Sequence, residues 1–225
     1  MQRYARNMNT LSPEENKNLR SFKVCVVGCG GLGGYVIEEL GRLGIGYITA
    51  VDGDAFEESN LNRQILSTTE NLGISKAYAA EERMKKVNPE IIVVPVYKRL
   101  DMENGLGIIE GHDVIIDALD NIESRLVLEK LAENAGIPIV HGAIAGWFGQ
   151  VSVVFPGDRT LSLLYPHNES RGIEKELGNP AFTPALVASL QVSEALKILI
   201  NRGEVLKKKL LVINLLEMEF EIIEL

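Results

Sequence analysis

The sequence predicts an α/β fold in which a mostly parallel sheet carries helices on both faces. Three observations lead to this fold class. Apolar runs of strand length alternate with segments of helix length from residue 22 to residue 136. The first run, at 22–28, is continuously apolar, which is typical of a central parallel strand. A Gly-rich turn follows this run directly and opens the next helix.

The first part of the chain contains alternating helices and strands. Ser12, Pro13 and Glu15 form a helix start, with a cap, a proline at the first helical position and a reciprocal glutamate, so a short helix should run to about residue 20. Strands are expected at 22–28, 47–52, 91–98 and 113–120, and helices at 31–44, 75–88 and 124–136. Pro95 cannot donate a ladder hydrogen bond, which places the third strand at or near an edge.

The second part of the chain departs from simple alternation. Residues 134–157 lack formal charge, but Pro138 and several glycines interrupt them, which favours two buried strands and a Gly-rich turn over a membrane span. Residues 156–182 form a long polar crossover loop, a length that is usually functional or mobile. A helix is expected at 184–203. A hairpin at 208–225 then extends the sheet with antiparallel C-terminal strands.

Composition limits the classes of function. Length and an apolar fraction of 46% suit one domain over residues 1–225. A net charge of −8 without a basic run argues against nucleic acid as a partner. Cys25 and Cys29 fall in the first strand and its turn and are expected to be buried thiols, consistent with a reducing cytoplasm. No apolar run follows Arg3 and Arg6, so no signal peptide is expected.

A phosphate-binding loop is the first functional feature. Gly28, Gly30 and Gly33 have G-x-G-x-x-G spacing between a strand and a helix, where a helix N-terminus favours phosphate. Asp52 ends the second strand, where an acid can accept hydrogen bonds from ribose hydroxyl groups. This context predicts nucleotide binding by a Rossmann-like sheet.

Charged residues favour ATP over NAD as the nucleotide. Cleavage of ATP develops charge on a leaving pyrophosphate, which calls for cations and a metal. Arg63 follows the second strand, Lys76 begins a helix, and Asp120 ends the fourth strand as a candidate Mg²⁺ ligand. Singly, each residue has a structural interpretation: Arg63 as a surface arginine, Lys76 as a solvated residue, and Asp120 as the N-cap of the next helix. Together they favour ATP with Mg²⁺.

Five motifs of this sequence resemble those of the ThiF/MoeB/HesA family, the bacterial relatives of ubiquitin-activating enzymes. They are "GCGGLG", "VDGDAFEESNLNRQ", "GISKA", "NP" and "DALDN", and the resemblance extends from about Arg3 to Leu199. It implies ATP-dependent adenylation of the C-terminal Gly-Gly carboxylate of a small ubiquitin-like sulfur carrier protein, with release of pyrophosphate. The product pathway would be of the thiamine or molybdopterin type.

The resemblance also implies roles for single residues. Asp52 would hold the ribose, with Gly31 and Asp54 in the same nucleotide site. Asn60, Arg63 and Lys76 would contact phosphates, and Asp120 would bind Mg²⁺. Arg6 would reach the ATP of the other subunit of a homodimer. Gln64 completes the motif without an assigned role.

Departures from the family pattern limit the expected chemistry. This chain has no C-x-x-C pair, so no zinc is expected, and no cysteine after Cys29, so no thiol is available in residues 156–182 for later transfer. His141 is expected to pack at a strand end and His167 to lie in a solvated loop, whereas Trp147 packs beside the site or in the core.

Three alternatives to carrier adenylation stay open. The first is an NAD-dependent oxidoreductase, which would need neither Arg63 nor Lys76. The second is a catalytically inactive nucleotide-binding regulatory protein. The third is activation of a modified tRNA base, which the acidic charge makes less attractive.

Overall fold

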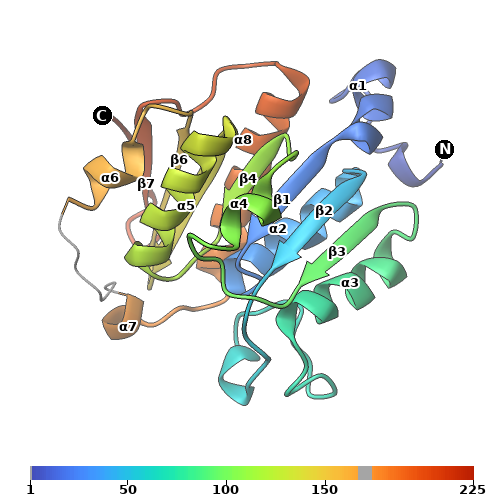
Figure 1. The fold of residues 1–225 in the computed structure, drawn as a ribbon, viewed down its shortest axis with the longest axis horizontal. Helices are drawn as coiled ribbons and strands as arrows, with labels where there is room; N and C mark the ends of the chain where they lie inside the picture. Colours follow the sequence, from blue (N-terminus) through green and yellow to red (C-terminus); the bar gives the residue numbers. More distant parts are fainter. Residues whose placement is uncertain (1, 167–173) are drawn as a thin grey trace.

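The structure is a computed structural model that describes residues 2–166 and 174–225. The described residues form one eight-stranded sheet in the order β3-β2-β1-β4-β5-β6-β7-β8 (Figure 1). The parallel strands are β1 (Lys23–Val27), β2 (Tyr47–Val51), β3 (Ile92–Val96), β4 (Val114–Asp117) and β5 (Ile139–Ala145). The antiparallel strands are β6 (Phe148–Val154), β7 (Lys209–Asn214) and β8 (Glu219–Glu224). The predicted fold class is confirmed.

Helices cover both faces of the parallel part of the sheet (Figure 1). One face packs against α2 (Gly31–Leu43), α3 (Lys76–Val87) and α8 (Phe182–Ile200). The other face packs against α4 (Gly105–Ile109), α5 (Ile122–Ala135) and α6 (Thr160–Leu164). Each face therefore has its own buried apolar cluster.

Strand β1 shows why its sequence is apolar throughout. Successive side chains of a strand point to opposite faces, so both sets are buried when helices cover both faces. Val24 and Val26 belong to the cluster under α2, whereas Cys25 and Val27 belong to the cluster under α5. Both cysteines are free and buried, as predicted. Burial raises the pKa of the Cys25 thiol to about 12.

The strand register positions the functional edge of the sheet. Val27, the last residue of β1, is paired with Val51 at the end of β2 and with Asp117 at the end of β4. The loops that follow these three strands consequently leave the sheet side by side. Ligands bind at this carboxyl edge in open parallel sheets.

The predicted elements agree with the structure apart from the shortest ones. The helix start at Ser12 is a capping box that opens α1 (Pro13–Asn18), and Pro95 lies in the edge strand β3. The crossover loop 156–182 contains two short helices that the sequence did not predict, α6 and α7 (Glu174–Leu177), and α4 was also missed. Helices of four or five residues are too short to display a hydrophobic period. His167 lies outside the described residues.

The N-terminal segment is packed against the rest of the chain, whereas chain termini are often frayed. Tyr4 is buried, and its hydroxyl accepts a hydrogen bond from Asn88 Nδ2 at 2.8 Å. Arg3 donates to the carbonyl of Val87 at 2.7 Å. The segment is therefore packed at the C-terminal ends of α2 and α3, near the amino edge of the sheet.

Among the described helices, α8 alone is long and apolar enough to cross a membrane. It packs against α2, β5 and β6. Gln191 on its buried side donates hydrogen bonds to the carbonyl oxygens of Asp117 and Val140. These contacts describe a core helix of the sheet.

Candidate functional site

The Gly-rich loop is shaped by contacts that exclude side chains. Gly28 has a φ of +98°, and a Cβ there would lie 2.5 Å from the carbonyl oxygen of Ala118. A Cβ at Gly33 would lie 1.8 Å from the carbonyl oxygen of Gly28, so this glycine lets α2 approach β1. Gly30 precedes the first residue of α2, and a Cβ there would meet no atom closer than 3.6 Å. The protein therefore forces glycine at 28 and 33, whereas the space at Gly30 is open to a ligand.

Asp52 fixes the loop at the end of β2. Its Oδ2 accepts a hydrogen bond from the backbone N–H of Cys29 at 2.7 Å, and its Oδ1 accepts one from Asp54 N at 2.8 Å. Burial raises the pKa of Asp52, although the charge of Lys76 and the two N–H groups oppose this shift. Each carboxylate oxygen keeps acceptor capacity, so Asp52 can also receive hydroxyl groups.

Asp54 lies between two cations. Its Oδ2 is 3.5 Å from Lys76 Nζ, and its Oδ1 is 3.0 Å from Arg99 Nη2. Burial raises the pKa of Asp54, but the hydrogen bond from Arg99 and the charges of both cations outweigh it and lower that pKa overall. Lys76 is the first residue of α3 and its side chain is only 10% exposed. The interpretation of Lys76 as a solvated surface residue was wrong.

The turn after β2 places Arg63 beside the Gly-rich loop. It contains a short 3₁₀ helix, Glu58–Asn60. Asn60 accepts a hydrogen bond from Glu57 N at 3.0 Å and so caps this helix. Arg63 donates to the carbonyl of Ser59 at 2.9 Å, and its aliphatic part lies where a Cβ on Gly31 would touch it.

Gln64 follows Arg63 and is 6% exposed. Its Oε1 is buried and has no hydrogen-bond partner within residues 2–166 and 174–225. The same holds for Asn179 Oδ1, on the segment before α8. Buried acceptors without partners are costly, and both residues line the cavity described below.

Asp120 is exposed beyond the end of β4. Its Oδ1 accepts a hydrogen bond from Asn121 Nδ2 at 3.3 Å. The N-cap of α5 is Asn121, whose side chain accepts a hydrogen bond from Ser124 N at 2.8 Å. The alternative interpretation of Asp120 as the helix cap was therefore wrong, and its carboxylate is left available for a cation.

These groups surround one cavity of about 780 Å³, a size that suits a nucleotide. Among the predicted site residues, those lining it are Gly28, Gly30, Gly31, Asp52, Asp54, Arg63, Lys76 and Asp120. Gly33 lies beneath the loop, and Asn60 is not part of the lining. Arg6 is exposed in the N-terminal segment, at the opposite edge of the sheet from the cavity of its own chain.

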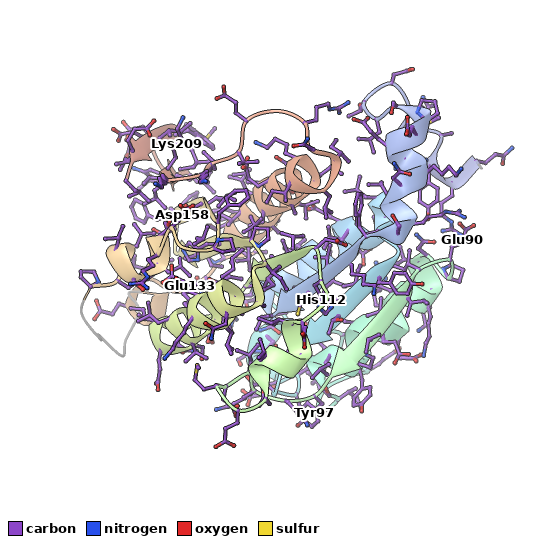
Figure 2. All side chains as sticks on the ribbon, turned by 45° about the horizontal axis from the view of Figure 1, so that its top comes forward. Glu90, Tyr97, His112, Glu133, Asp158 and Lys209 are labelled. Atoms are coloured by element: carbon purple, nitrogen blue, oxygen red, sulfur yellow. The ribbon has the colours of Figure 1, made fainter. Side chains whose placement is uncertain are left out.

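Figure 2 shows this separation of the two edges. Its labels mark Glu90 and Tyr97, which precede and follow β3. Glu90 lies beside the N-terminal segment, where it forms an ion pair with Arg20 at 2.6 Å, and Tyr97 lies at the other end of the strand. The chain continues from Tyr97 into the cavity wall at Lys98 and Arg99.

Three basic residues of the cavity were not predicted from the sequence: Lys98, Arg99 and Arg125. Lys98 and Arg99 follow the third strand at the same edge as Asp52, so the rule that identified Asp52 also applied to them. Arg125 is held on α5 by the carbonyl of Leu119 at 2.6 Å.

A buried polar network lies behind Arg125. His141, expected to pack at a strand end, lies within β5, and its Nδ1 is 2.7 Å from Asp117 Oδ2, so the N–H is on Nδ1. Burial lowers the pKa of His141, although Asp117 opposes this shift. Tyr165 OH is 3.3 Å from His141 Nε2 and accepts from Gln150 Nε2 at 2.6 Å. The network reaches the cavity through Arg125, whose Nη1 donates a hydrogen bond to Tyr165 OH at 3.4 Å.

A metal ion in this cavity would need ligands from a bound molecule as well as from the protein. Within residues 2–166 and 174–225, no group of three or more His, Cys, Asp or Glu side chains could hold a metal ion. Mg²⁺ is commonly held by one or two carboxylates together with substrate phosphates. Asp120 at the cavity rim fits this arrangement.

Trp147 is partly exposed and packs on Phe182 with ring centroids 4.5 Å apart.

Known proteins resemble this chain along its whole length. Residues 4–225 match the ThiF family model. The SAMP-activating enzyme E1 of Haloferax volcanii is 35% identical over 98% of this chain and 84% of its own. The sulfur carrier protein adenylyltransferase of Thermus thermophilus is 37% identical over 98% of this chain and 85% of its own. The molybdopterin-synthase adenylyltransferase of Salmonella typhimurium is 32% identical over 92% of this chain and 84% of its own.

Solved structures share the fold. The crystal structure described as E. coli MccB with ATP superposes with a TM-score of 0.85 at 21% identity, covering 99% of this chain and 70% of that one. The crystal structure of PaaA superposes with a TM-score of 0.82 at 21% identity, covering 99% and 72%.

Proposed function

Since the chain belongs to the ThiF family, we propose that it adenylates the C-terminal Gly-Gly carboxylate of a ubiquitin-like sulfur carrier protein with ATP. The observation that carries this proposal is the cavity itself. Three glycines of the phosphate loop, a candidate ribose-binding acid, two cations and a candidate metal-binding carboxylate lie around one space: Gly28, Gly30, Gly31, Asp52, Arg63, Lys76 and Asp120. The relatives named sulfur carrier protein adenylyltransferase and molybdopterin-synthase adenylyltransferase support it.

The nucleotide would lie along the carboxyl edge of the sheet. We assign the ribose to Asp52 and the phosphates to the open N-terminus of α2, with the side chains of Arg63 and Lys76 also in contact with them. Backbone N–H groups and these two side chains would neutralise the triphosphate charge. Asn60 would act by shaping the turn that carries Arg63, because its amide oxygen already caps that turn.

The reaction would be an in-line displacement at the α-phosphorus. A carboxylate oxygen of the carrier forms a new bond to this phosphorus while the bond to the bridging oxygen of the β-phosphate breaks. The products are the carrier acyl-adenylate and pyrophosphate, which keeps the bonding electron pair. Bound Mg²⁺, held by Asp120 and phosphate oxygens, would neutralise charge on the leaving group. The carboxylate is already ionised, so positioning and charge neutralisation supply the acceleration.

The carrier tail would enter from the side of β5. Ala143, Gly178 and Asn179 line that wall, away from Asp52. Asn62 Nδ2 donates to the carbonyl of Asn179 at 3.2 Å, which joins the segment before α8 to the turn of Arg63. We infer that this wall receives the Gly-Gly end, whose lack of side chains allows a close approach.

We further propose a homodimer in which Arg6 serves the site of the other subunit. Arg6 lies at the opposite edge of the sheet from its own cavity, so only a second chain could bring it to a nucleotide.

Later sulfur transfer would use other thiols. Burial raises the pKa of Cys29 well above its ordinary value, and Cys25 is likewise buried. We propose no zinc site and a cytoplasmic location.

The test is ATP–pyrophosphate exchange by the purified protein. Label from pyrophosphate should enter ATP only when Mg²⁺ and a carrier ending in Gly-Gly are present. A carrier lacking its last glycine is the control. Binding of ATP without exchange for any carrier of the source organism would favour the regulatory protein, and NADH-dependent turnover would favour the oxidoreductase. Label exchange driven by tRNA in place of the carrier would favour activation of a tRNA base.

A further inference from the structure

Arg99 binds Asp54, the carboxylate that forms an ion pair with Lys76. We propose that Arg99 is a positioning residue of the nucleotide site, which binds Asp54 so that Lys76 is free to contact phosphates. This inference rests on the proposed function, because it takes Lys76 as a phosphate ligand.

Lys76 and Arg99 each form an ion pair with Asp54, close to the end of β2. Lys76 Nζ is 3.5 Å from Asp54 Oδ2, which is longer than a charge-assisted hydrogen bond of about 2.8 Å. Arg99 Nη2 is 3.0 Å from the other oxygen, Asp54 Oδ1. The contact to Lys76 is thus the looser of the two, and Arg99 makes the closer contact.

Burial explains why Lys76 needs a counterion. Its side chain is 10% exposed, whereas that of Asp54 is 49% exposed and that of Arg99 is 84% exposed. A buried ammonium group requires an opposite charge. Asp54 supplies this charge without a ligand, and phosphate oxygens would supply it with one.

The transfer of Lys76 to a phosphate would leave Asp54 with one cation. Without Arg99, the Asp54 carboxylate would hold Lys76 more strongly and repel phosphate oxygens in the same cavity. With Arg99 in place, Asp54 remains neutralised after Lys76 has moved. Arg99 would therefore lower the electrostatic cost of binding a polyphosphate without touching it.

The backbone is built to bring Arg99 to this place. A Cβ at Gly53 would lie 2.5 Å from Arg99 Cγ and 2.9 Å from Arg99 N, so only glycine allows this close approach. The carbonyl of Arg99 accepts a hydrogen bond from Asn104 Nδ2 at 3.0 Å. Gly53 lies between the two acids Asp52 and Asp54. The close approach of Arg99 explains why glycine occupies this position.

The experiment measures the affinity of the full-length protein for Mg²⁺–ATP and for adenosine by calorimetry. Arg99→Ala should weaken ATP binding by about threefold to fivefold, because exposed ion pairs are worth about this factor. Adenosine binding should stay unchanged, since it has no phosphate. Arg99→Lys should recover most of the loss, because it keeps the charge.

The double variant Arg99→Ala/Asp54→Asn separates positioning from direct contact. Removing the charge of Asp54 should free Lys76 again and return ATP affinity toward that of the wild type. A double variant no better than Arg99→Ala would overturn the inference, as would a loss of adenosine affinity in Arg99→Ala.

A matched control is Arg83→Ala. Arg83 lies on the same helix as Lys76 but outside the cavity lining. It is one of two cations that form ion pairs with Glu38. This variant should bind ATP normally. If the wild type fails to bind ATP, or Lys76→Ala binds it equally well, both the proposed function and this inference fall. If Lys76→Ala is impaired and Arg99→Ala is not, only this inference falls.

Discussion

At the scale of single residues, Asp52 shows how one side chain can serve structure and binding together. Its two oxygens hold Cys29 N and Asp54 N, so it ties the Gly-rich loop to the end of β2 before any ligand arrives. Asp52, Arg63, Lys76 and Asp120 could be predicted as one site because each follows a strand or begins a helix at the same edge. The burial of Lys76 against Asp54 could not, because it depends on a contact across 22 positions of sequence.

The Asp120 carboxylate is separable from the cap of α5. Asp120→Asn should lower exchange by about a hundredfold or more, because a metal-bound contact to the leaving group is lost. Its free energy of unfolding should stay unchanged, since Asn121 caps the helix. The comparison is Asn121→Ala, which should lose about 1 kcal/mol in urea unfolding. Normal exchange by folded Asp120→Asn would remove Asp120 from the site.

His141 should make the protein less stable in mild acid. Its pKa is lowered by burial, so the unfolded chain, with an ordinary pKa of 6.5, takes up a proton first as the pH falls. The unfolded state then binds more protons, and stability falls below about pH 6.5 by at most about 1.4 kcal/mol per pH unit. Urea unfolding at about pH 7.5 and 5.5 should show this loss in the wild type and a smaller one in His141→Gln. Equal losses would contradict a neutral buried His141.

At the scale of elements, hydrophobic pattern predicted the strands and the long helices because both faces of the parallel sheet are covered. The short helices α4 and α6 gave no such signal. They are positioned by tertiary contacts, as when Glu129 of α5 accepts hydrogen bonds from Leu161 N and Ser162 N of α6. The Gly-rich loop depends on both the sequence pattern and the tertiary contacts, because its conformation is set by the packing of α2 on β1.

Two glycines at the start of α2 should respond differently to alanine. Gly33→Ala would place a Cβ 1.8 Å from the carbonyl oxygen of Gly28, so it should lose more than about 2 kcal/mol of stability. Gly31→Ala meets only the flexible Arg63 side chain at 3.5 Å and should be neutral or gain up to about 1 kcal/mol. Urea unfolding of both variants makes the comparison. Equal stability would mean that α2 can move off β1 freely.

At the scale of the whole molecule, the nucleotide cavity and the N-terminal segment lie at opposite edges of the sheet. Tyr4 and Arg3 fasten that segment to the ends of α2 and α3, which sequence could not predict because their partners lie 84 positions away. This packing gives Arg6 a fixed place on the outside of the chain. A site shared between subunits follows only if a second chain brings Arg6 to the cavity.

Mixing two inactive variants tests that sharing. Arg6→Ala and Asp120→Asn should each lack activity alone. After subunit exchange, a mixed dimer has one site in which both residues are intact, so activity should return to at most about a quarter of wild type by random pairing. No recovery despite demonstrated exchange would mean that Arg6 does not act across an interface.

Intact mass spectrometry of the carrier can detect directly whether this cavity joins AMP to a carrier carboxylate. The carrier is incubated with Mg²⁺–ATP and one equivalent of the protein. We expect a gain of one adenylyl group at the terminal glycine, reversed by added pyrophosphate and absent with Asp120→Asn. An unmodified carrier with the wild-type protein, or equal adenylation with Asp120→Asn, would contradict it.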